Sequence, residues 1–147
     1  MSRKLKSLFG IIFGAIMGSI LFLLFDTYIW RAVNITEYTP GFIFIVILLG
    51  ALHYATGFPA GFLAVHIAKT RDLRNMLLIS FVTGFIFFVT VCYTKLTLIT
   101  IEYGGTGHPG IIFIFPVYSP AIITTMLGGL ISYRLRKTKD KNRPFLQ

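Results

Sequence analysis

The chain has 147 residues, of which 55% are hydrophobic and 13% are charged, with a mean hydropathy of +0.78 and a formal net charge of +9. A soluble domain of this length and composition would expose far too much apolar surface to water, which excludes an ordinary soluble fold. The single cysteine, Cys92, has no partner in the chain, so an intrachain disulfide is excluded as well.

Stretches without charged residues recur along the chain at lengths that suit a membrane. A bilayer core of about 30 Å requires roughly 20 apolar helical residues. The first stretch has the basic start of a secretory signal, but its apolar run is too long and no small-residue cleavage pattern follows, so we expect a retained helix. The sequence therefore predicts an all-α integral membrane protein with four transmembrane helices, at about residues 8–30, 41–68, 76–99 and 110–133.

Basic residues gather on one side of these four spans. Twelve of the 14 Lys and Arg residues precede the first span, lie between the second and third, or follow the fourth, and only Arg31 and Lys95 lie on the opposite side. Lys and Arg beside span ends stay in the cytoplasm, so we expect a multi-pass protein of the cell membrane with both termini cytoplasmic. We expect these residues to contact anionic lipid headgroups at that face, and we expect no nucleic-acid partner.

Two stretches of the sequence are repeated in the same order. EYTPGFIFI begins at Glu37 and EYGGTGHPGIIFI at Glu102, whereas GFLAVHIAKTRD begins at Gly61 and GLISYRLRKTKD at Gly129. The repeats are offset by 65 to 69 residues, and repetition at a nearly constant spacing is typical of internal duplication. The alternative is convergence, because proline is favoured in the first turn of a helix and basic residues belong at cytoplasmic span ends.

Duplication would divide the chain into two equivalent hairpins. The first would cover residues 1–72 and the second 73–140, with a basic tail at 141–147. Because each hairpin has two spans, both would have the same orientation and would be related by an axis along the membrane normal. Such an axis can hold a pore or a groove for a partner.

Small residues recur at four-residue intervals in the predicted spans, which permits close contact between helix backbones. In the first two spans these residues are Gly10, Gly14, Gly18, Gly57 and Gly61. Alanines at 60, 64 and 68 follow the same spacing in the second span, and residues 121, 125 and 129 follow it in the fourth. We expect these ladders to be helix-packing surfaces.

The second span is too long for a straight helix across the membrane. Its 28 residues would extend about 42 Å at about 1.5 Å per residue, so it must tilt or break. Pro59 is the predicted hinge because proline removes a backbone donor, and Pro120 is the corresponding candidate in the fourth span. Such kinks are also tolerated in membrane helices with no moving part.

Few residues in the spans could carry chemistry. His53 lies near the centre of the second span and is a candidate for lining a route or binding a partner, together with Glu37 and Glu102 on the non-cytoplasmic side. A structural imidazole that is hydrogen-bonded to a neighbouring helix is the alternative for His53. The three histidines lie at different depths, and no catalytic or nucleotide-binding motif is present, so we expect no metal site, no cofactor and no catalysis.

Two opposite charges lie at similar depth in the first and third spans. Asp26 and Lys95 are 69 residues apart, within the range of the repeat offsets. They could form an ion pair that joins the two halves, provided that the first and third spans pack together. Alternatively, each side chain could reach the headgroups separately, with Asp26 close to Arg31.

Taken together, size and predicted topology favour a non-catalytic membrane protein that binds a partner within the bilayer, either another membrane protein or a second copy of itself. An accessory subunit and an immunity-type factor are the two forms of this hypothesis. The competing hypothesis is a small transporter or channel whose route follows the pseudo-two-fold axis. A partner that co-purifies would separate the first hypothesis from the second.

Overall fold

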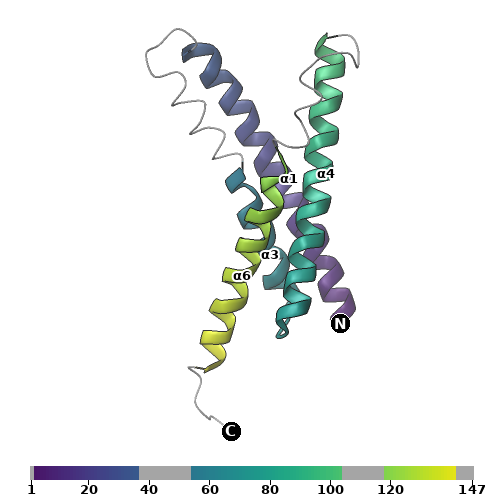
Figure 1. The fold of residues 1–147 in the computed structure, drawn as a ribbon, viewed down its shortest axis with the longest axis vertical. Coiled ribbons are helices and arrows are strands. Elements are labelled where there is room, and N and C mark those ends of the chain that lie inside the picture. The colour runs from purple at the N-terminus through teal and green to yellow at the C-terminus, as the bar shows by residue number, and fades with distance from the viewer. Residues whose placement is uncertain (1, 37–53, 104–117, 142–147) are drawn as a thin grey trace.

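The computed structural model describes residues 2–36, 54–103 and 118–141, and in these ranges the protein consists of helices without strands (Figure 1). The predicted all-helical class is confirmed for this part of the chain. α1 and α4 contain the first and third predicted spans, whereas α3 and α6 begin partway through the second and fourth. The helices are α1 (Arg3–Thr36), α3 (Gly57–Ala68), α4 (Leu73–Tyr103) and α6 (Pro120–Lys141).

Two of these helices are long and apolar enough to cross a membrane. The qualifying stretches, Arg3–Tyr28 of α1 and Leu73–Leu98 of α4, have 26 residues each. Many of their large apolar side chains are exposed, including Phe13 on α1 and Phe85 on α4. An exposed apolar surface of this extent suits contact with lipid or with another protein better than contact with water.

The helices alternate in direction and share one charged end. The first turn of α1, the connection between α3 and α4 and the last turns of α6 lie together at one end of the molecule (Figure 1). We call this the basic end, and we call the opposite end, where α1 and α4 finish, the far end. The basic end carries Arg3, Lys4, Lys6, Lys69, Arg71, Arg74, Arg134, Arg136, Lys137, Lys139 and Lys141.

The short helix α3 occupies the centre of the bundle. It contacts α1, α4 and α6, while α4 also contacts α1 and α6; α1 and α6 have little contact with each other among the described residues. Its small residues explain this position, because Ala60, Ala64 and Ala68 are buried and leave room for neighbouring backbones. The chain then leaves α3 through Lys69, whose φ of 51° is left-handed and whose backbone N–H donates to the Val65 carbonyl at 3.2 Å.

The glycine ladder of α1 packs against the alanine ladder of α3. A Cβ atom added to Gly10 would collide with the Ala64 carbonyl oxygen, and one added to Gly14 would lie 2.5 Å from the Ala60 carbonyl oxygen. Gly18 faces the Cβ atom of Ala60. The two backbones are therefore in direct contact along this interface.

The second pair of ladders joins α3 to α6. A Cβ atom on Gly61 would overlap the backbone of Thr125, and one on Gly57 would collide with the hydroxyl of Thr124. From the other side, a Cβ atom on Gly128 would overlap the carbonyl oxygen of Phe58. The small residues singled out in the sequence thus lie at helix contacts in both interfaces.

Both α3 and α6 begin directly after an interruption. Tyr54 and Ala55 are helical, Thr56 forms a turn, and α3 starts at Gly57; similarly, Ser119 forms a turn before α6 starts at Pro120. Pro59 accordingly lies in the first turn of α3 and Pro120 opens α6, where a missing N–H costs no intrahelical hydrogen bond. The interruptions lie beside both candidate hinges, and movement about them stays a prediction.

Candidate functional site: a buried Asp26–Lys95 ion pair

Asp26 on α1 and Lys95 on α4 form a buried ion pair. The Lys95 Nζ atom lies 2.6 Å from each carboxylate oxygen of Asp26. The two side chains are only 9% and 10% exposed, respectively. Of the two arrangements that the sequence left open, the structure contains the one that joins the first and third predicted spans.

A regular pattern of contacts between α1 and α4 brings the two charges together. The stripe Gly14, Gly18, Phe22 and Asp26 on α1 runs beside the stripe Thr83, Phe87, Val91 and Lys95 on α4. A Cβ atom on Gly14 would lie 3.0 Å from Thr83 Cγ2, and one on Gly18 would lie 3.2 Å from the Phe87 ring. Gly14–Thr83, Gly18–Phe87 and Asp26–Lys95 are each 69 residues apart. Packing of four-residue ridges between two parallel helices therefore sets the register of the ion pair.

Aromatic side chains lie beside the ion pair on the side toward the basic end. Phe22, Phe87, Val91 and Ala121 form a buried cluster, against which Tyr118 packs. The Phe22 ring meets the Phe87 ring edge-on at 6.3 Å between centroids, and it meets the Tyr118 ring at 5.5 Å. The Lys95 Nζ atom lies 5.9 Å from the Phe22 centroid, within the range of a cation–π contact.

These surroundings determine what the ion pair can do. In an apolar environment the attraction between opposite charges is much stronger than in water, while an unpaired charge is costly. The pair therefore holds α1 against α4 and makes each helix depend on the other. Removing one partner would take from the other its contact across the α1–α4 interface.

The other candidate residues fall mostly outside the described ranges. Glu37 and His53 lie beyond them, and Glu102 lies in the last turn of α4, but its side chain is outside the description. A route lined by these three residues therefore stays a prediction. Among the described residues no three His, Cys, Asp or Glu side chains gather closely enough to hold a metal ion.

Two polar contacts of α6 were not expected from the sequence. The Thr124 hydroxyl donates to the Tyr54 carbonyl at 2.7 Å, next to the interruption that precedes α3. The Arg136 guanidinium donates to the His66 carbonyl at 2.7 Å, at the end of α3 where the helix dipole favours a cation. In the sequence Arg136 is one of several basic residues after the fourth span, and nothing in the pattern separates it from the others.

Both ends of α3 are thus held by side chains of α6, and the ion pair holds α1 to α4. These contacts make the described helices one connected bundle.

Comparison of the chain with protein-family models, with curated proteins and with solved structures gives no match.

Proposed function

We propose that the protein is a four-span protein of the cell membrane that binds another membrane protein, or a second copy of itself, within the bilayer without catalysing a reaction. The observation that carries this proposal is that paired and packed side chains fill the α1–α4 interface. The two buried charges neutralise each other, and the rings of Phe22 and Phe87 pack beside them. The described space between α1 and α4 is thus occupied by packing, whereas exposed apolar faces of both helices remain for a partner.

Cytoplasmic termini are part of the proposal. The alternating direction of the helices and the gathering of basic residues at one end support this orientation. With Cys92 replaced by Ser, a cysteine introduced at Gly105 should react with an impermeant thiol reagent added outside the cell, and a cysteine introduced at Thr138 should not. The reverse labelling pattern would contradict the orientation and the proposal that depends on it.

We also propose that the two hairpins, residues 1–72 and 73–140, arose by duplication. Support comes from the contacts between α1 and α4, which join positions 69 apart, and from the repeats in the sequence, which have offsets of 65 to 69. Among the described residues the two halves differ in one contact, because α3 packs on α4 while α1 has little contact with α6. A structure that describes residues 40–72 and 109–140 together would test whether the halves superpose without inversion.

A small transporter or channel is the second candidate function. It is favoured by one observation, the combination of an ion pair between the two halves with interruptions before both α3 and α6. In that case the pair would close the far end, and rotation at Pro59 and Pro120 would open it.

Crosslinking in native membranes followed by purification separates the two functions. Recovery of one other membrane protein, or of a second copy, in a constant ratio would support partner binding. Passage of a solute through proteoliposomes that contain only this chain would support the transporter and contradict the leading proposal. The variant Asp26→Asn, which removes one charge of the ion pair, should be compared in both experiments. It should reduce recovery of the partner if the first function is right, and it should increase passage of the solute if the second is right.

A further inference from the structure

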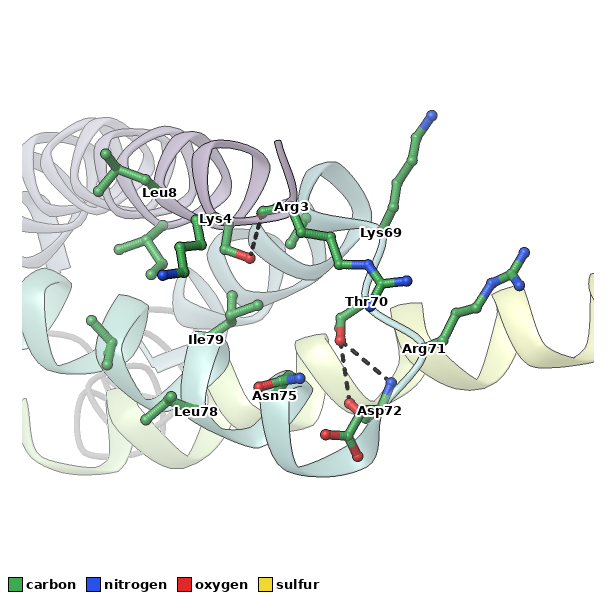
Figure 2. A pocket seen from close by; sticks show the side chains of 14 residues that line it. Arg3, Lys4, Leu8, Lys69, Thr70, Arg71, Asp72, Asn75, Leu78 and Ile79 are labelled. Carbon is green, nitrogen blue, oxygen red and sulfur yellow. Dashed lines mark hydrogen bonds between the residues drawn. The ribbon is translucent and has the colours of Figure 1, made fainter. Parts of the chain in front are cut away.

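A pocket of about 730 Å³ opens at the basic end between the start of α1 and the start of α4 (Figure 2). One wall comes from the first turns of α1, and the other comes from the α3–α4 connection with the first turns of α4. A volume of this order is typical of sites for small molecules.

The rim of this pocket is strongly positive. Arg3 and Lys4 contribute from α1, and Lys69 and Arg71 contribute from the connection, against a single acid, Asp72. That acid is already engaged, because its carboxylate accepts the backbone N–H of Arg74 at 3.2 Å and caps α4. The rim therefore has an excess of cationic donors that suits a phosphate group, which guanidinium and ammonium groups bind well.

Below the rim the pocket is apolar. Leu8 and Ile11 line it on α1, and Leu78, Ile79 and Val82 line it on α4. Leu8 and Leu78 are exposed, at 53% and 61%, so that the apolar part of the pocket is open to the surroundings. From Lys4 to Ile11 the wall extends about 10 Å along α1 at about 1.5 Å per residue. A molecule that fits both regions has an anionic head and a hydrocarbon chain that runs along the helices.

We infer that this pocket binds the headgroup and the first acyl carbons of an anionic phospholipid from the leaflet that faces the basic end. The inference rests on the proposal that the protein spans the membrane, and it is independent of the partner proposed above. It differs from general attraction to a negative surface, because it assigns binding to the four cations of the pocket rim and to the apolar lining beneath them. The basic residues of the same end that do not line the pocket have no part in it.

The charge of the pocket is tested by binding to the full-length protein in detergent. Phosphatidylglycerol and phosphatidylcholine are added separately, and bound lipid is counted by native mass spectrometry. We expect the protein to retain phosphatidylglycerol at least tenfold better than phosphatidylcholine. Arg3→Gln with Lys4→Gln should abolish this preference, whereas Arg134→Gln with Lys137→Gln, which removes the same charge outside the pocket, should keep it. Equal losses in the two double variants would overturn the inference.

The shape of the pocket is tested without any change of charge. Ser7 lines the pocket, and its hydroxyl donates only to the Arg3 carbonyl of its own helix. Ser7→Phe should fill the space and reduce the binding of phosphatidylglycerol about as much as the Arg3/Lys4 double variant does, and retained binding would contradict a built site. Glycerol 3-phosphate alone should not bind; if it does, the pocket serves a soluble phosphate instead of a lipid. Correct labelling at Gly105 and Thr138 in all variants separates failure of the site from failure of the proposed topology.

Discussion

The two halves of α1 are held in the bundle by different means. Toward the basic end its glycines lie against the backbone of α3, so that contact depends on the absence of side chains. Toward the far end Phe22 and Asp26 contact α4 through large or charged groups. The far ends of α1 and α4 lie apart, as Figure 1 shows. Small residues therefore hold α1 against α3 near the basic end. The long side chain of Lys95 joins α4 to α1 where these two helices begin to separate.

The largest effect is expected from reversing one charge of the ion pair. Asp26→Lys places two cations together in a buried site, and loss of a buried partner typically costs about 3–5 kcal/mol. The free energy of unfolding in detergent and the amount of protein in the membrane should both fall. Lys95→Asp should have a similar effect, and the double exchange should recover most of the loss.

Lys137→Asp, at an exposed position of α6 at the basic end, is the control for the reversal of Lys95 and should have little effect. If the losses in the double exchange simply add, the two charges do not act as a pair, and the ion pair does not explain how the far half of α1 is held.

A side chain added to the glycine ladder tests the other half of α1. Gly10→Leu places a branched side chain against the Ala64 carbonyl oxygen, and overpacking of this kind costs about 1–3 kcal/mol. Thr27→Leu enlarges an exposed position on the same helix and should leave thermal unfolding unchanged. If the two variants were equally stable, α1 could move away from α3 at no cost in free energy. That result would contradict close packing of the two backbones.

The aromatic cluster should have an effect no larger than that of the glycine ladder. Phe22→Leu removes the edge-on contacts to Phe87 and Tyr118, and such contacts are worth about 0.5–1.5 kcal/mol each. Phe25→Leu makes the same change at an exposed position of α1 and should cost less than about 0.5 kcal/mol. Thermal unfolding of the two variants side by side measures the difference in their stability. If there is no difference, the aromatic cluster does not help to hold α1 in the bundle.

The smallest effect concerns the interruption before α3. Thr124→Val removes the hydrogen bond to the Tyr54 carbonyl and should cost about 0.6–1 kcal/mol. Thr90→Val removes a hydroxyl that donates to the Ile86 carbonyl within its own helix, so it should be nearly neutral. Hydrogen exchange near Tyr54 should increase only in the first variant. An equal increase in both would show that the Thr124 hydrogen bond does not stabilise the backbone before α3.

The sequence predicts the helices and their packing residues better than it predicts the site. Helices and glycine ladders follow from local spacing, although α1 and α4 continue to Thr36 and Tyr103, past the last apolar residues of their spans. For Asp26 and Lys95 the sequence indicates similar depth, but depth does not tell which face of a helix a side chain occupies. The four-residue stripes that end at these two residues carry that information. The pocket at the basic end combines three segments and could not be recognised before they were folded together.

The ion pair also has a consequence for the order in which the chain is made. Asp26 leaves the ribosome 69 residues before Lys95, an interval of roughly 3 to 14 seconds at about 5–20 residues per second. During this time Asp26 does not yet have Lys95 beside it, so the first helix lacks the ion pair that later joins it to α4. Chains that stop before α4 would lack this contact between the two helices. The pair thus distinguishes complete chains from incomplete ones.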